Sequence, residues 1–154
     1  MNKIDSFRGS YYFLSNFFEI PVTYDGITYK NNEAAFQAQK CLDYEDRKQF
    51  SHLNPTEAKH LGRRVSLRPD WERVKIQEMT NIVHEKFDQN KDLRQKLLDT
   101  DSAYLEEGNN WGDRIWGTVN GNGQNLLGQI LMAEREKIKE QMKETETDIE
   151  MPEL

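Results

Sequence analysis

The sequence contains a single cysteine, Cys41, among 154 residues, and only three histidines. One cysteine cannot form a disulfide within the chain, and it excludes a zinc cluster built on cysteine ligands. The histidines, His52, His60 and His84, do not have the spacing of metal ligands. We therefore predict no metal site and no cofactor.

Long apolar runs are also missing. No stretch of the chain approaches the roughly 20 consecutive apolar residues that a membrane-spanning helix requires. The opening Met-Asn-Lys-Ile-Asp-Ser lacks the apolar core of a signal peptide. We therefore expect a soluble cytoplasmic protein that has no membrane partner.

Basic residues are outnumbered, because 21 Lys and Arg face 27 Asp and Glu, for a formal net charge of −6. Residues 144–154 carry part of this excess, since they include acidic residues but no Lys or Arg. The balance disfavours broad nucleic-acid binding through a basic face, but it is compatible with a local pocket for phosphates. The following arginines are either candidates for that pocket or scattered solvated residues: Arg8, Arg63, Arg64, Arg68 and Arg114.

The length is that of one domain, which can bury a single core. The hydrophobic fraction of 36% is low, yet 7 Phe, 6 Tyr and 3 Trp are too many for a disordered chain. We expect one domain with an aromatic-rich core over residues 1–143, followed by an acidic, disordered tail over residues 144–154. No internal repeat or linker interrupts the domain.

Strands are expected near the N-terminus, where residues 10 to 30 are predicted to form short strands. Val22-Thr23-Tyr24 and Ile27-Thr28-Tyr29 flank Asp25-Gly26, a two-residue turn signal that predicts a β-hairpin. No other part of the sequence gives a clear strand signal. The sheet is therefore expected to be small.

From Asn32 onward the pattern is helical, and Asn32 is the expected cap of the first helix. Asn54, Pro55 and Glu57 form the capping-box signature of a second helix, which Gly62 should end. The expected helices run over residues 33–42, 54–62, 71–88, 93–98 and 125–143. Lys86 falls within the apolar stripe of the helix over 71–88, where spacing alone favours a snorkelling side chain over a buried one.

Residues 106–117 are the most informative segment, because they combine Glu, Asn, Trp, Gly, Asp and Arg within a short stretch. Gly and Asn favour loop backbone, carboxylates can move protons, and Trp rings can stack on a flat ligand. Glu106 and Glu107 cannot both face one site in an extended segment. Trp111 and Trp116 are equally compatible with a binding role and with a place in the core.

Two further segments could serve a site. On the helix over 33–42, Glu33, Gln37 and Lys40 share one polar face, which is either solvated or functional. The Gly-rich residues 116–128 lead into a helix, and their backbone N–H groups could hold an anion. This second segment is not a P-loop, because the Gly-Lys-Ser/Thr ending is absent.

Taken together, several segments resemble the YbiA-like N-glycosidases, also called the NADAR family for a proposed link to NAD and ADP-ribose. They occur in the family's order along nearly the whole chain up to the tail. The matching segments include Phe13 to Phe17, Tyr29 to Glu33, Phe36 to Lys40, Ala58-Lys59 with Gly62-Arg63, Lys86-Phe87, Leu105 to Asn109, Trp111, Asp113, Trp116-Gly117, and Asn125 to Gly128 with Arg135. Departures are Ala34, where relatives often have His, and Gly112 before Asp113.

This resemblance implies an α+β, predominantly helical fold and an enzyme that hydrolyses the N-glycosidic bond of ribosylated amines. The substrates it implies are small phosphorylated N-ribosides, such as the aminopyrimidine intermediates of riboflavin synthesis, or nucleotides with ADP-ribosylated guanine. A non-catalytic module that binds ADP-ribose is the alternative. A protein-interaction adaptor, suggested only by the acidic tail, is a remote third possibility.

The resemblance also implies roles for particular residues. Lys40 is the lysine that fits the motif for a Schiff base, and Glu107 or Asp113 would supply and remove protons. A direct attack by water would need two carboxyl groups but no lysine. The expected substrate-binding residues are Arg8, Asn16, Glu33, Gln37, Arg63, Trp111 and Trp116.

Overall fold

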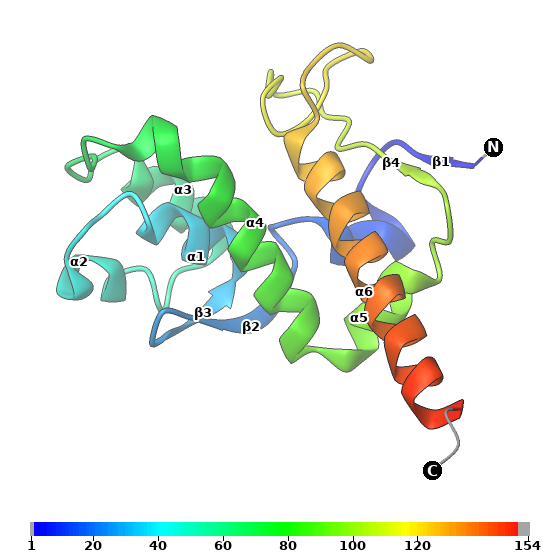
Figure 1. Cartoon of the computed structure of the whole chain (residues 1–154). Helices are drawn as coiled ribbons and strands as arrows, with labels where there is room; N and C mark the ends of the chain where they lie inside the picture. Colours follow the sequence, from blue (N-terminus) through cyan, green and yellow to red (C-terminus); the bar gives the residue numbers. More distant parts are fainter. Residues whose placement is uncertain (1, 151–154) are drawn as a thin grey trace.

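Helices make up most of the chain in the computed structural model, which describes residues 2–150. The described residues also contain two small sheets, so the expected α+β, predominantly helical fold is confirmed. In chain order (Figure 1) the elements are β1 (Lys3–Ile4), the 3₁₀ helix η1 (Gly9–Leu14), β2 (Glu19–Tyr24), β3 (Ile27–Asn31), α1 (Asn32–Ala38), α2 (Tyr44–Lys48), α3 (Pro55–Gly62), α4 (Trp71–Gln89), α5 (Lys91–Leu98), β4 (Tyr104–Leu105) and α6 (Leu126–Glu150).

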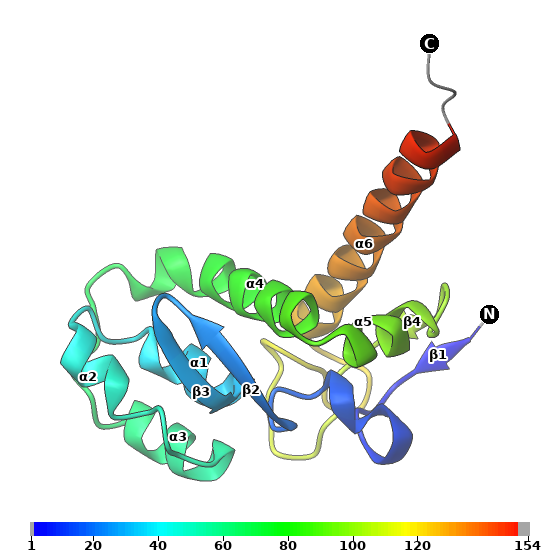
Figure 2. The same cartoon turned by 90° about the horizontal axis from the view of Figure 1, so that it is seen from below.

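The long helix α4 lies between two groups of elements. It contacts α1 and β2 on one side and α6 on the other. Figures 1 and 2 show α1, α2, α3 and the hairpin together, with α5, α6, β1 and β4 across α4 from them. The apolar stripe predicted for α4 is buried at Trp71, Met79, Ile82, Val83 and Phe87, so this helix supplies much of the core.

The predicted β-hairpin is present, with β2 antiparallel to β3 and Val22 opposite Tyr29. Asp25 and Gly26 both have positive φ, at 50° and 85°, as the tight turn between two twisted strands requires. Upstream of the hairpin the prediction of strands is wrong, because Gly9–Leu14 forms η1. Bonds such as Ser15 N to Tyr12 O close its turns, despite the strand propensity of its aromatic residues.

A second sheet, not foreseen in the sequence, joins the N-terminus to the middle of the chain. β1 pairs in parallel with β4, and Ile4 lies opposite Leu105. Each strand has two residues, too few for a hydrophobic alternation to be recognised. The pairing matters for the site because Glu106 N continues it by donating to Ile4 O at 2.9 Å.

The two helices near the hairpin begin at asparagine caps. Asn54 and Glu57 form the predicted capping box of α3. The cap of α1 is Asn31 and not Asn32, because Asn31 ends β3 in extended backbone and its side chain accepts from Ala34 N. α1 also ends earlier than predicted, at Ala38, where Gln39 N donates to Phe36 O in a tighter turn.

The last helix continues past the predicted end of the domain. α6 runs through Glu150, so the expectation of disorder from Glu144 is wrong for residues 144–150, and residues 151–154 lie outside the described part. Within the extension, the three Glu residues are good helix formers, whereas the two Thr and the Asp are not. Its C-terminal end projects beyond the body of the molecule (Figure 2). No helix within residues 2–150 has both the length and the apolar character to cross a membrane.

Lys86 is buried on α4 with only 1% of its surface exposed, so the expectation of a snorkelling side chain is wrong. Its Nζ donates to Ser15 O at 3.0 Å and lies 5.7 Å from the Phe18 ring and 5.4 Å from the Phe87 ring. Burial lowers the pKa of this amine to about 7. Lys86 therefore ties α4 to the loop that follows η1.

The Lys86→Met variant should lose a pH dependence of stability that the wild type has. Above about pH 7 the folded protein has released the Lys86 proton, whereas the unfolded chain keeps it up to about pH 10. Through Lys86, raising the pH in this window therefore adds to the stability of the wild-type fold, by at most about 1.4 kcal/mol per pH unit, so the wild-type slope should exceed that of Lys86→Met. Urea unfolding at pH 7, 8 and 9 measures the slope for both proteins.

The exposed Lys91→Met substitution is the control, and it should leave the wild-type slope unchanged. Equal slopes for wild type and Lys86→Met would show that the buried amine stays charged in the folded state.

Candidate active site

A cavity of about 470 Å³ opens between the α1 and α3 helices, the segment around η1, and the loop over residues 107–116. Met79 of α4 also lines it. The cavity brings together every predicted site residue except Lys40: Arg8, Asn16, Glu33, Gln37, Arg63, Glu107, Trp111, Asp113 and Trp116. Residues that are far apart in the sequence thus share one site.

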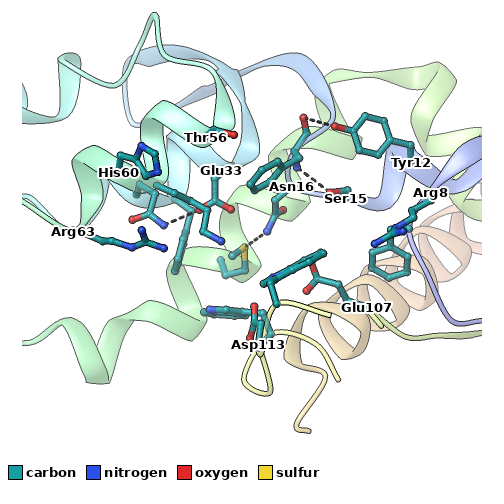
Figure 3. Close-up of a pocket in the computed structure, with 18 residues that line it drawn as sticks. Arg8, Tyr12, Ser15, Asn16, Glu33, Thr56, His60, Arg63, Glu107 and Asp113 are labelled. Atoms are coloured by element: carbon teal, nitrogen blue, oxygen red, sulfur yellow. Dashed lines mark hydrogen bonds between the residues drawn. The ribbon is translucent and has the colours of Figure 1, made fainter. Parts of the chain in front are cut away.

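Three carboxyl groups line this cavity, from Glu33 on α1 and from Glu107 and Asp113 on the loop. Figure 3 shows the two loop carboxyls on one side and Glu33 across from them. Burial, together with the negative charges of Asp113 and Glu33, raises the pKa of Glu107 to about 8. Glu107 is therefore largely protonated at neutral pH, and its Oε2 has no hydrogen-bond partner among the described residues.

The neighbouring Glu106 points away from the cavity, as expected for adjacent residues in extended backbone. Its carboxylate pairs with Lys3 Nζ at 3.0 Å and accepts from the Thr118 hydroxyl. The Thr118 bond and the Lys3 pair lower the pKa of Glu106. Of the two glutamates, only Glu107 lines the cavity.

The polar face predicted for the first helix is buried and not solvated. Gln37 Nε2 donates to Glu33 Oε2 at 2.7 Å, which leaves Gln37 Oε1 without a partner among the described residues. Burial raises the pKa of Glu33, and the Gln37 bond opposes this shift. Gly62 of α3 packs against Gln37, and a Cβ at this position would overlap the Gln37 amide.

Lys40 lies at the end of this face but is not among the residues that line the cavity. Its Nζ donates to Gly62 O at 3.2 Å. Burial lowers the pKa of Lys40, helped by the charges of Arg63 and Lys59 and opposed by Glu33. The lysine that does line the cavity is Lys59, whose Nζ lies 5.7 Å from the Phe17 ring.

Basic side chains stand at opposite sides of the cavity. Figure 3 shows His60 and Arg63 of α3 on one side and Arg8 on the other. Among the described residues none of these, nor Lys59, forms an ion pair with a carboxylate. Arg68, by contrast, is paired with Asp70 at 2.7 Å, and neither Arg64 nor Arg114 lines the cavity. Of the five candidate arginines, only Arg8 and Arg63 are placed to meet a phosphate there.

Both loop tryptophans line the cavity, in different ways. Trp116 packs edge-on against Phe36, with ring centroids 5.2 Å apart, so it lines the cavity and also packs against the core. Trp111 is 56% exposed at the rim.

Sequence reasoning missed several lining residues, namely Phe7, Tyr12, Ser15, Phe17, Thr56, Lys59, His60 and Met79. Helical spacing offered a signal for two of them, because Lys59 and His60 precede Arg63 by one turn.

The Gly-rich segment before α6 does not offer the anion site suggested by its sequence. Leu126 N donates to Ile115 O at 3.1 Å, Leu127 N to Trp116 O at 3.0 Å, and Asn125 N to Gly117 O at 3.2 Å. The amide groups at the start of the helix therefore hold the loop that carries Asp113 and Trp116. They are not free to bind a ligand.

Comparisons with known proteins concern the sequence and the fold as a whole. The model of the NADAR domain family matches residues 5–139. The chain is 41% identical to the N-glycosidase YbiA of Escherichia coli (strain K12) over 80% of this chain and 79% of that protein. It is 36% identical to a riboflavin biosynthesis protein of Vibrio vulnificus, and the match covers 83% of this chain and 36% of that longer protein. The NMR structure of E. coli YbiA superposes with a TM-score of 0.78 at 35% identity, covering 98% of this chain and 88% of that chain.

Replacing Asp113 by Asn should lower the pKa of Glu107 from about 8 by about one unit or more, because a nearby negative charge is removed. The Asn side chain can still accept from Ile115 N and Trp116 N, as Asp113 Oδ1 does at 3.0 and 2.9 Å. A ¹³C NMR titration of the Glu107 carboxyl in ligand-free protein measures the shift, with Glu107→Gln for assignment. The remote Asp101→Asn substitution should change nothing, and an unaltered Glu107 pKa in Asp113→Asn would contradict the electrostatic coupling.

Proposed function

The chain belongs to the NADAR domain family, and we propose that it is an N-glycosidase acting on phosphorylated N-ribosides. The reaction cleaves the bond between C1 of a ribose and the nitrogen of an attached amine, with uptake of water. The observation that carries this proposal is the pair Glu107 and Asp113 in one cavity, with the pKa of Glu107 raised to about 8. Glu107 is thus ready to donate a proton, and a second carboxyl group lies in the same cavity.

In the first step, Glu107 donates its proton to the ring oxygen of the ribose. The bond from C1 to this oxygen then opens, and C1 and the amine nitrogen form a protonated imine. Glu33 is placed across the cavity, where it and Gln37 can orient sugar hydroxyls. Asn16 offers a side-chain amide, whose Nδ2 has only the weak acceptor Met79 Sδ at 3.5 Å.

A neutral lysine then adds to C1, and the amine leaves as free base after taking up a proton. Water hydrolyses the resulting lysine imine, which releases the open-chain sugar as an aldehyde and restores the amine. We assign this role to Lys40, because its lowered pKa favours the neutral form that attack requires. Its Nζ would have to leave Gly62 O and turn towards the cavity.

Two substrate classes are candidates for this cavity. An aminopyrimidine riboside phosphate from riboflavin synthesis is supported by the name of the Vibrio relative. A nucleotide with ADP-ribosylated guanine carries more phosphate, which the basic groups on both sides of the cavity could bind. In either case Trp111 or Trp116 would stack on the base.

Glu107→Gln should lower turnover of these substrates by about 10²- to 10⁴-fold, because the amide cannot donate the catalytic proton as an acid does. Calorimetry should show that affinity changes much less. Glu106→Gln is the matched comparison, since Glu106 faces Lys3 and Thr118 outside the cavity. Mass spectrometry of released base measures turnover for a ribosylated aminopyrimidine phosphate and for ADP-ribosylated guanosine. If the wild type binds these substrates tightly but releases no base, the protein is a nucleotide-binding module and not an enzyme.

Borohydride reduction during turnover should trap a sugar adduct on the wild-type protein, and peptide mass spectrometry should place it on Lys40. The adduct and the activity should disappear in Lys40→Ala and persist in Lys59→Ala. An adduct that disappears only in Lys59→Ala would assign the nucleophile to the lysine lining the cavity. If base is released without any adduct, and Lys40→Ala releases it as fast as the wild type, direct attack by water between Glu107 and Asp113 is favoured.

A further inference from the structure

Asn109 lies between Glu107 and Asp113 in the sequence, and its side chain binds the backbone of both residues. Its Nδ2 donates to Asp113 O at 2.9 Å and, more weakly, to Glu107 O at 3.4 Å. Its Oδ1 accepts from Asp113 N at 3.0 Å and from Trp111 N at 3.3 Å. One side-chain amide thus uses both of its ends within a single short loop.

We infer that Asn109 is a positioning residue, which holds Glu107 and Asp113 at their working separation and presents Trp111 at the cavity rim. This inference rests on the proposed function, because it concerns the same pair of carboxyl groups. Asn109 itself does not line the cavity. It acts through the backbone of the residues on either side.

The rest of the loop holds Asn109 in this position. Asn109 N donates to Thr118 O at 2.9 Å, and Thr118 N donates to Glu107 O at 2.9 Å. Gly117 lets the chain pass closely, because a Cβ there would overlap Glu107 O and lie 2.8 Å from Asn109 Nδ2. The loop is therefore built around this side chain, which is fixed on both sides.

A second asparagine fixes Glu107 alone. Asn125 Oδ1 accepts from Glu107 N at 3.0 Å, while its Nδ2 donates to Leu105 O at 2.9 Å. These bonds set the direction of the Glu107 side chain but do not reach Asp113. Within the described residues, Asn109 is the side chain that hydrogen-bonds the backbone of both Glu107 and Asp113.

The separation of the two carboxyls has an electrostatic consequence that can be measured. The charged and titratable groups that share the cavity with Glu107 are Asp113 on its own loop, Glu33 on α1, Lys59 and His60 on α3, Arg63 directly after α3, and Arg8 before η1. Loss of the Asn109 amide removes the bonds that fix the Asp113 backbone, so Asp113 can move together with the turn that its carboxylate caps, while the groups on α1, near α3 and before η1 stay where they are. A displaced Asp113 acts less on Glu107, so the Glu107 proton becomes easier to lose.

The test is a ¹³C NMR titration of the Glu107 carboxyl in ligand-free Asn109→Ser protein, which does not depend on any substrate. We expect the pKa of Glu107 to fall from about 8, but by less than in Asp113→Asn, because the Asp113 charge is displaced and not removed. In an Asp113→Asn background the same substitution should cause no further fall, because the charge it displaces is already gone. The basic limb of the pH profile of kcat/KM, which reports the free enzyme, should move by the same amount.

Asn110→Ser is the matched control, since Asn110 is the adjacent exposed residue and does not line the cavity. It should leave the Glu107 titration unchanged. If Asn109→Ser does not fold, Asn109→Gln keeps the amide one methylene further out and should also lower the pKa. An unchanged Glu107 pKa in a folded Asn109 variant overturns the inference, as does a fall of equal size in the Asp113→Asn background. Absence of glycosidase activity in the wild type would instead count against the proposed function.

Discussion

Crowding of carboxyl groups in a partly desolvated cavity is the constraint on which the rest of this site depends. Glu33, Glu107 and Asp113 line one cavity, and low solvent access makes three negative charges there costly. The cost is reduced when Glu107 holds a proton near neutral pH, in keeping with its raised pKa. A fold that keeps these groups together must position each one, because a displacement of Asp113 or Glu33 would weaken the repulsion that, in addition to burial, raises the pKa of Glu107.

Two parts of the fold hold these carboxyl groups in position, and the two parts lie next to each other at the cavity. Helices α1 and α3 pack against each other and carry Glu33 and the basic groups, and the close contact of Gly62 with Gln37 permits this packing. The loop over 107–116 is held by the amide groups at the start of α6 and by the side chains of Asn109 and Asn125. Lys86 of α4 also holds the segment after η1 in place, because its Nζ donates to Ser15 O. Polar contacts thus act together with helix packing to set the relative positions of the catalytic candidates.

Local signals were predictable from the sequence, and tertiary placements were not. The Asp25-Gly26 turn, the Asn54 capping box and the start of α4 depend on neighbouring residues, so their residue types indicated them. The pairing of β1 with β4 joins distant segments, and neither two-residue strand carries a pattern. Residue chemistry and family resemblance identified Glu107 and Asp113, but the direction of the Lys40 amine and the burial of Lys86 depend on which elements pack above them.

Binding and protonation are coupled in this arrangement. The Lys59 charge lowers the pKa of Glu107 and Glu33, against the effect of burial. Under the proposed function, a substrate phosphate that pairs with Lys59 or Arg63 would offset this positive charge and would add negative charge to the cavity. Both changes raise the pKa of Glu107 further. Substrate binding would therefore strengthen the hold of Glu107 on its proton until the ribose ring oxygen is in place to receive it, and an acid with a pKa near 8 in the free protein suits that role at neutral pH.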